Sequence, residues 1–358
     1  MHKIYKDFFK WFLIFSPVYL ILLFSCVLRI DGYVYLPGNL TDIKKEVVVE
    51  GYDDDLNGSV SSVYVMVLEK PTYMSYALAS LAKYSVNGKY TKAEADAIDT
   101  ELDNAIGTFD AEESFQMASV AAFNELKDKI EFEYEELTYI YSAKKDIEAN
   151  MKYTSIVGKL IKRVGSLDKD YPSFEEINTE LSNTPWGQSI DIVLEDSKGK
   201  TYDLNIKKSD ENGLFGITIR KSFRVTKAPE VKVNNVYTQG PSGGAMQSLY
   251  IYLLLNNDED LLKGRNIAGT GTITYTYDSE NNLVLGKVGA IGCVGQKLYS
   301  AYLDNASVFY CPESNYDECM RYYNLFGFTE KDIRVVKVST LSDIISDLRS
   351  TKWNSLNH

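Results

Sequence analysis

Residues 240–255 read GPSGGAMQSLYIYLLL, and this stretch is the clearest structural signal in the chain. After the glycines, apolar residues recur every three or four positions, which predicts an amphipathic helix. These residues are Ala245, Met246, Leu249, Tyr250, Leu253 and Leu254. A strand is expected just before, over residues 231–237, so Ser242 lies on a glycine-lined turn between strand and helix. Backbone N–H groups and the helix dipole at such a turn suit a developing negative charge, although a serine there is also typical of an ordinary helix cap.

Two further glycine-rich segments follow this helix. Residues 267–273 read IAGTGTI and predict a glycine-broken strand, and residues 286–297 read GKVGAIGCVGQK and predict a strand and turn that enter a helix. Lys297 falls in the first turns of that helix, beside Val294 and Leu298. A lysine acts as a base near neutral pH only if its pKa falls from about 10.4 to about 7–8. Burial in a dry apolar pocket supplies such a shift.

The overall composition excludes several classes of function. The chain has 358 residues, 45% of them hydrophobic, which is enough for two soluble domains with true cores beside any membrane anchor. Its net charge of −12 argues against nucleic-acid binding. The only two histidines, His2 and His358, stand at the frayed ends of the chain. A Ser-His-Asp triad, a Cys-His dyad and an HExxH zinc site are therefore excluded.

No motif for a metal or a nucleotide is present. The four cysteines, Cys26, Cys293, Cys311 and Cys319, show no CxxC spacing, and the acidic helical segments contain no DxDxDG loop. Cys311 and Cys319 are close enough in sequence to form a small disulfide loop, with free half-buried thiols as the alternative. The chain has no GxxxxGK[ST] loop, so neither a cofactor nor ATP is expected.

The N-terminus predicts a membrane helix. Residues 11–28 carry no charge and would span roughly 27 Å as a helix, close to the hydrocarbon thickness of about 30 Å. Lys3, Lys6 and Lys10 precede them with Asp7 as the only acid, which places the N-terminus in the cytoplasm and the rest outside. A retained anchor is favoured because no small-x-small cleavage site follows. A cleaved signal peptide and a lipoprotein modified at Cys26 are the alternatives.

The middle of the chain predicts a mixture of strands and helices. Strands are expected at residues 46–50 and 62–68, and alanine, glutamate and leucine predict helix over residues 92–152. Thr91 and Ser173 begin capping boxes, the second before a helix over residues 174–181. Residues 189–195 and 201–206 form an expected hairpin. This helix and hairpin, ending GQSIDIVLEDSKGKTYDLNIKK, resemble the second half of a PDZ domain, with an unrelated α+β domain as the alternative.

The ordered set GPSGG, IAGTGTI, GKVGAIGCVGQK and FYCP, within residues 240–312, resembles the proteolytic domain of the Lon protease family. The order of anchor, PDZ-like segment and Lon-type segment is similar to the membrane-anchored PDZ–Lon peptidases of Gram-positive bacteria. The resemblance implies a catalytic Ser–Lys dyad of Ser242 and Lys297, with Thr270 orienting the lysine. Gly240 and Gly243 are implied as supporting residues. Cys293 stands where the family has the second glycine of IGG, and Thr272 stands where ATP-dependent members have glutamate.

The fold expected from these features is α+β, with a transmembrane helix, a PDZ-like domain carrying a helical insertion and a Lon-type α/β proteolytic domain. The expected divisions are a cytoplasmic tail (1–10), an anchor (11–30), a linker with the first strand (31–60), the PDZ-like domain (61–210, insertion about 92–152) and the Lon-type domain (211–350). The expected function is an ATP-independent serine endopeptidase that cleaves secreted peptides or flexible protein segments outside the cytoplasmic membrane. A catalytically inactive scaffold that binds extracytoplasmic peptides and a solute- or cell-wall-binding ectodomain are the alternatives. Lon-type domains often form rings, so the resemblance keeps a homo-oligomer open.

Overall fold

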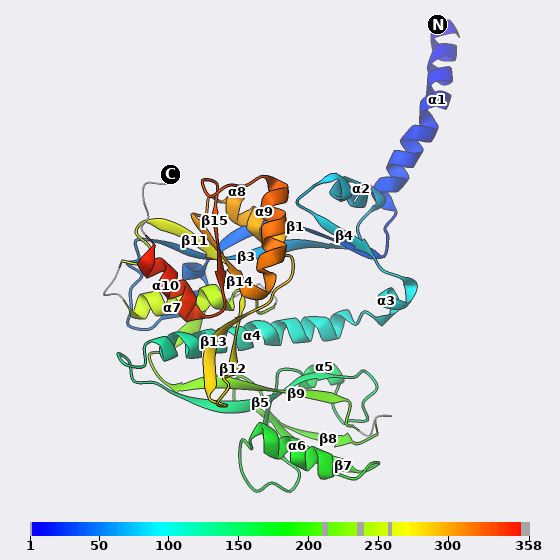
Figure 1. The fold of residues 1–358 in the computed structure, drawn as a ribbon. Helices are drawn as coiled ribbons and strands as arrows, with labels where there is room; N and C mark the ends of the chain where they lie inside the picture. The colour runs from blue at the N-terminus through cyan, green and yellow to red at the C-terminus, as the bar shows by residue number, and fades with distance from the viewer. Residues whose placement is uncertain (1, 210–213, 235–239, 257–259, 352–358) are drawn as a thin grey trace.

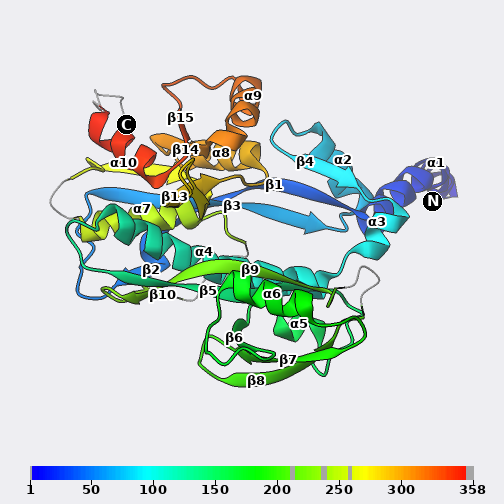
Figure 2. The same ribbon diagram turned by 60° about the horizontal axis from the view of Figure 1, so that its bottom comes forward.

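The structure is a computed structural model that describes residues 2–209, 214–234, 240–256 and 260–351. It is a mixed α+β protein with one long apolar helix at the N-terminus, a six-stranded sheet and a five-stranded sheet (Figure 1). The two sheets lie on opposite sides of a long helix, α4 (Thr100–Glu125), which runs between them in both views (Figures 1 and 2).

The N-terminal helix α1 (His2–Val27) projects away from the rest of the molecule (Figure 1). Its 19 residues Phe9–Val27 form a segment that is long and apolar enough to cross a membrane, and none of its hydrophobic window is buried within the protein. Length and composition therefore qualify this helix as a candidate membrane span. This part of the sequence-based expectation agrees with the structure.

The six-stranded sheet has the order β15-β14-β11-β3-β1-β4. β3, β11, β14 and β15 are parallel, and β1 is antiparallel to both β3 and β4. The strands are β1 (Gly32–Asp42), β3 (Gly58–Glu69), β4 (Val86–Lys89), β11 (Arg265–Gly269), β14 (Val308–Pro312) and β15 (Arg334–Val338). β11 pairs with β3 only as far as Ser62, so in the described part of the chain the β11-facing edge of β3 is unpaired from Val63 onward.

Helices cover both faces of this sheet. Successive side chains along a strand point to opposite faces, and each face packs into its own apolar core. In β14, Val308 and Tyr310 point into a core shared with α4, α7 (Gly244–Leu255) and α10 (Leu341–Ser350). Phe309 and Cys311 point into a second core with α8 (Val294–Leu303) and α9 (Tyr316–Phe326). Cys319 lies in the same second core, and all four cysteines are free thiols.

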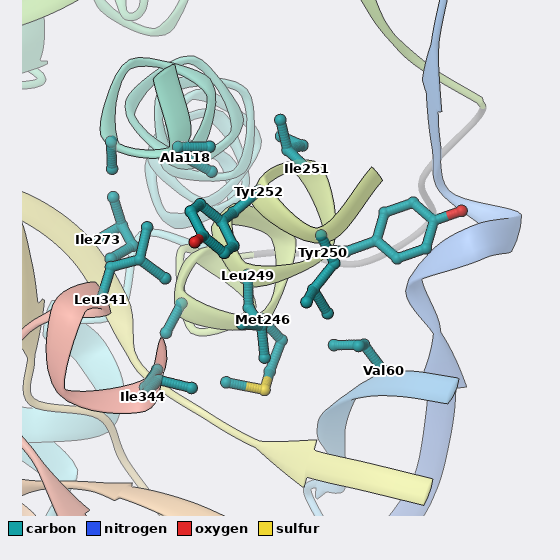
Figure 3. Close-up of a cluster of buried hydrophobic side chains, with 14 of the residues drawn as sticks. Val60, Ala118, Met246, Leu249, Tyr250, Ile251, Tyr252, Ile273, Leu341 and Ile344 are labelled. Carbon is teal, nitrogen blue, oxygen red and sulfur yellow. The ribbon is translucent and has the colours of Figure 1, made fainter. Parts of the chain in front are cut away.

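Helix α7 is the centre of the larger core (Figure 3). All twelve of its residues are buried, whereas the sequence pattern predicted an amphipathic helix with one exposed face. Helix α4 packs along one side of α7, and Figure 3 shows Ala118 of α4 in the same buried cluster as Tyr252. Polar ends of α7 are bonded to other segments, because the Tyr250 hydroxyl donates to Asp54 at 3.1 Å and the Tyr252 hydroxyl accepts from Arg349 of α10 at 2.8 Å. Small side chains at Ala118, Ala121 and Ala122 are at most 1% exposed and let the two helices approach closely.

The five-stranded sheet has the order β8-β7-β6-β5-β9 and a separate apolar core. Its strands are β5 (Glu133–Ala143), β6 (Leu160–Val164), β7 (Ser189–Glu195), β8 (Thr201–Lys207) and β9 (Ile217–Lys227). Helices α5 (Tyr153–Ile156) and α6 (Phe174–Asn183) belong to the same unit. The unit therefore occupies the chain between α4 and the strand β10.

The remaining elements are short. Two small antiparallel sheets pair β2 (Val47–Val49) with β10 (Val231–Val233) and β12 (Thr272–Tyr277) with β13 (Leu283–Gly289). Helices α2 (Tyr73–Leu81) and α3 (Lys92–Ala97) and the 3-10 helices Ile43–Lys45 and Glu313–Asn315 complete the chain. Both expected capping boxes, at Thr91 and Ser173, are present.

Three sequence-based expectations differ from the structure. Helix was predicted through residue 152, but residues 133–143 form β5, where Tyr139 and Ile140 fit a pleated surface better than a helix. The helix of residues 100–125 is not an insertion in a PDZ-like unit, because it packs on α7 in the larger core. The strand expected over residues 231–237 is seen for Val231–Val233, and residues 235–237 lie outside the described residues.

The expected division at residue 61 separates segments that share one sheet. β1 and β3 come from residues 32–69, yet β3 pairs directly with β11 from the C-terminal half. Residues 31–60 are therefore part of the larger unit and not a linker. The parallel pairing of β3 and β11 joins segments about two hundred residues apart, and no local sequence pattern reports such a pairing.

We expect Ala118→Leu to lower the free energy of unfolding by about 1–3 kcal/mol, because three added carbons have no space between α4 and α7. Ala93→Leu, on the exposed surface of α3, is the matched control and should change stability little. The measurement is the thermal unfolding midpoint of both full-length variants in the same detergent. Equal midpoints for wild type and Ala118→Leu would contradict the close α4–α7 packing.

Candidate functional site

The turn before α7 is held from two sides, and this fixes the position of Ser242. The carbonyl of Pro241 accepts a hydrogen bond from Ser114 Oγ of α4 at 3.0 Å. The carbonyl of Ser242 accepts two hydrogen bonds, one from Thr270 Oγ1 at 3.1 Å and one from the Gly271 N–H at 2.9 Å. The turn is thus bonded both to the long helix and to the loop between β11 and β12.

Two glycines let these backbones approach closely. Gly271 has a φ of +155°, and a Cβ there would lie 2.6 Å from Val288 Cγ1. A Cβ on Gly244, the first residue of α7, would lie 2.5 Å from Ser114 Oγ and 3.0 Å from the backbone nitrogen of Ile273. Larger residues at either position would push the serine turn away from α4 or from the β11–β12 loop.

Gly240 and Gly243, expected as supporting residues, flank Ser242. Gly240 has a φ of +87°, and its N–H donates to the Gly107 carbonyl at 3.1 Å. Gly243 is the N-terminal cap of α7. Neither the Ser242 N–H nor the Gly243 N–H has an acceptor among the described residues, so both are available at the positive end of the helix dipole.

Lys297 lies on the first turn of α8 and is buried, with 4% of its surface exposed. Its Nζ donates a hydrogen bond to Thr270 Oγ1 at 3.1 Å, and Thr270 is fully buried. The Thr270 hydroxyl in turn donates to the Ser242 carbonyl. One threonine therefore connects the lysine side chain to the backbone of the serine.

Burial lowers the pKa of Lys297 to about 8 from its ordinary value of 10.5. The cause is loss of water around the ammonium group, which the neighbouring Cys293 thiol opposes weakly. Within the described residues no carboxylate forms an ion pair with this lysine, so the neutral amine is populated near physiological pH.

The structure brings Ser242, Thr270 and Lys297 into one cluster but does not join the serine and lysine side chains directly. Among the described residues, the Ser242 hydroxyl makes no hydrogen bond, and the Lys297 amine bonds only to Thr270. Catalytic hydrogen bonds are often long without substrate and shorten in the complex. The connection that the structure shows runs from the Lys297 amine through the Thr270 hydroxyl to the backbone carbonyl of Ser242.

Cys293 caps α8 with a φ of 60°, in the left-handed region that favours glycine. A non-glycine residue in this conformation stores strain of about 1–2 kcal/mol. Its thiol is half-buried, and burial raises the pKa of this thiol despite the nearby lysine. A protonated thiol is a weak nucleophile, so Cys293 shapes the wall of the lysine pocket and does not compete with Ser242.

A cavity of about 880 Å³ opens beside Ser242. Ser242 and Gly243 line it together with residues of β3, α4 and β10, whereas Lys297 and Thr270 are not among its lining residues. The part of β3 that enters the cavity, Ser62 to Tyr64, is where β11 ends and the strand edge becomes unpaired.

The sequence did not single out Ser114, Glu46 or Gln247, although all three line this cavity. Ser114 lies within α4, where a serine has no distinguishing motif, and Glu46 is one of fifty acidic residues. Gln247 belongs to the stretch of residues 240–255 and follows Gly243 by four positions. Residues at this spacing share one face of a helix, and this was the only sequence signal that could have placed Gln247 beside the serine turn.

Within the described residues, no group of three or more His, Cys, Asp or Glu side chains is arranged to hold a metal ion. No family model matches the chain, and no curated protein matches it.

We expect Lys297→Met to stabilise the folded protein by about 3 kcal/mol at pH 7. The folded-state pKa of about 8 lies below the unfolded value of 10.5, so below pH 8 the fold holds a buried charge at a cost in free energy. That cost disappears as the pH rises from 8 to 10.5, and the two proteins should then converge in stability.

The measurement is denaturant unfolding of the full-length protein in detergent at pH 7 and at pH 10. Lys331→Met, an exposed lysine without a described ion pair, is the control for loss of a positive charge. Lower stability of Lys297→Met at pH 7 would contradict the depressed pKa.

Proposed function

We propose that the protein is a membrane-anchored serine endopeptidase in which Ser242 is the nucleophile and Lys297 is the general base. The observation that carries this proposal is the buried lysine, which has a pKa of about 8 and is connected through Thr270 to the serine turn. Burying an amine without a carboxylate partner destabilises a fold, so such a residue beside a turn serine favours a catalytic role.

The neutral Lys297 amine keeps one N–H bond to Thr270, which orients its lone pair. The lone pair accepts the proton of the Ser242 hydroxyl while the serine oxygen bonds to the carbonyl carbon of a peptide. The N–H groups of Ser242 and Gly243 stabilise the resulting oxyanion. The lysine ammonium then protonates the leaving amine as the C–N bond breaks, which gives an acyl-enzyme.

Water completes the reaction. It attacks the acyl-enzyme ester, gives its proton to the Lys297 amine, and releases the peptide acid as the serine oxygen recovers a proton. Thr270 acts as a positioning residue throughout, because it contacts the lysine and the serine backbone and not the peptide. No step requires a metal or a nucleotide.

The substrate backbone fits along the unpaired edge of β3. From Val63 onward this edge lacks a partner among the described residues, and it begins at the cavity that contains Ser242. An extended peptide that adds to this edge can form main-chain hydrogen bonds with β3 beyond Ser62, where the pairing of β3 with β11 ends. This binding mode requires flexible substrates, such as secreted peptides or unstructured protein segments.

The five-stranded sheet is proposed as a PDZ-like docking unit for the same substrates. Its strand β9 is an edge strand, and Lys221 of β9 lies 5.9 Å from the ring of Phe174 at the start of α6. An edge strand beside a helix suits β-augmentation by an extended segment. Together with α1, the positive N-terminal flank supports an orientation with both sheets outside the cytoplasmic membrane.

We expect Ser242→Ala and Lys297→Met each to reduce peptide cleavage by about a thousandfold or more, because the two residues act as a unit. The assay incubates the full-length protein in detergent with a pool of unstructured peptides and identifies products by mass spectrometry. Ser248→Ala removes a buried hydroxyl within α7, one turn after its first residue Gly244, and is the control that should stay active. Equal cleavage by all variants would refute the dyad, and no cleavage by the wild type would favour a peptide-binding scaffold.

The rate of cleavage should depend on the protonation of Lys297. We expect kcat/KM to rise about tenfold per pH unit below pH 8 and to level off above it, because only the neutral amine accepts the serine proton. The check is initial rates on one cleaved peptide from pH 6 to pH 10. A midpoint near 10.5 would mean that the lysine is solvated in the active protein and would contradict the mechanism.

A further inference from the structure

The cavity beside Ser242 has a distinct charge. Two glutamates line it, Glu46 from the turn before β2 and Glu112 from α4. No lysine or arginine lines it in the part of the chain that the structure describes. The remaining lining side chains are neutral, so the cavity has a negative potential next to the proposed nucleophile.

Glu46 is the unusual member of this pair. It is 7% exposed and forms no ion pair within the described residues, and burial raises the pKa of its carboxyl group. Asp42 lies close enough to raise that pKa further, while a hydrogen bond from the Gln247 side chain opposes both effects. A buried carboxylate without a cation costs free energy and is seldom kept without a ligand or a partner.

Other acids on the same helix do have a cation. Asp110 and Glu113 of α4 both bond to Arg220 of β9, each at 2.7 Å. Glu112 lies between them in sequence, is exposed, and faces the cavity without an ion pair among the described residues. The chain therefore neutralises the carboxylates of α4 that face β9 and leaves the cavity acids uncompensated.

Gln247, the hydrogen-bond partner of Glu46, supplies a second feature. Its Oε1 atom is buried and has no hydrogen-bond partner in the described residues, and the side chain is 8% exposed and lines the cavity. Its Nε2 lies 3.7 Å from the position that a Cβ on Gly243 would take. The unpaired Oε1 acceptor thus belongs to a side chain whose Nε2 lies near the serine turn and that forms a hydrogen bond with the buried Glu46 carboxylate. Both groups require a donor of N–H bonds, and a positively charged one satisfies both.

We propose that this cavity binds a lysine or arginine side chain of the substrate at the residue before the scissile bond, with Glu46 as its anionic partner and Gln247 Oε1 as a second acceptor. The inference rests on the proposed peptidase function, because it assigns the side-chain specificity of the same site. Glu112, an exposed residue of the cavity lining, attracts the cationic side chain of the substrate before that side chain enters the cavity. The substrate class is therefore flexible peptides with a basic residue at the cleavage position.

The test compares matched peptides in the full-length protein. A peptide cleaved by the wild type is synthesised with arginine or with its neutral isostere citrulline before the scissile bond. We expect kcat/KM to be at least about tenfold higher for arginine, and Glu46→Gln to abolish this preference while citrulline cleavage stays within about twofold. Gln removes the buried charge at constant shape, so the variant should fold, and its thermal midpoint checks this.

The control variant is Glu50→Gln, which makes the same change four residues away on an exposed side chain outside the cavity. It should keep the arginine preference. Equal kcat/KM for arginine and citrulline in the wild type would overturn the inference and leave the peptidase intact. A preference that persists in Glu46→Gln would also overturn it.

A binding measurement separates this inference from the function on which it rests. Fluorescence anisotropy follows a labelled unstructured peptide with one central arginine or citrulline as it binds the Ser242→Ala protein. Tighter arginine binding that Glu46→Gln abolishes supports the cation site even if no peptide is cleaved. Equal binding of the two peptides overturns it, whatever the cleavage assay shows.

Discussion

The hydrogen bond from Lys297 to Thr270, made between two buried side chains, is the interaction on which the site depends. It requires that α8 and the β11–β12 loop meet with little space between them, and the two apolar cores on either side of the six-stranded sheet bring them together. The same threonine bonds the serine turn, so any shift of the sheet against α8 would separate the lysine from the serine. The lysine lowers the stability of the fold at neutral pH, and the surrounding core offsets this cost.

The long helix α4 relates the two sheets to this site. On one side its alanines pack against α7 and its Ser114 bonds the serine turn, and on the other its acids bond Arg220 of the five-stranded sheet. The cavity beside Ser242 is lined by α4 and includes Ser197 from the β7–β8 turn. The five-stranded unit therefore contributes directly to the wall of this cavity. Because α4 contacts both units, a displacement of one unit would shift a helix that the other unit also contacts.

Much of the local structure was predictable from the sequence. The turn at residues 240–244, the helix after it and the helix that carries Lys297 follow from glycine placement and apolar spacing. The two capping boxes and the β7–β8 hairpin were also correctly placed. The strand over residues 133–143 was missed because its glutamates also suit an exposed helix. Its strand conformation depends on pairing with β6 on one side and β9 on the other.

By itself, the sequence determined the glycine-rich turns and the apolar spacing around Ser242 and Lys297, and its two terminal histidines favoured lysine over histidine as the candidate base, because these features depend on residue type and spacing. It also determined the long apolar N-terminal helix, which depends on length and composition. Only the tertiary structure decided that Lys297 is buried, that β3 pairs with β11 and that Glu46 lines the cavity of Ser242. Burial, strand pairing and charge compensation arise from segments far apart in the chain, and local sequence patterns carry no information about which of those segments meet.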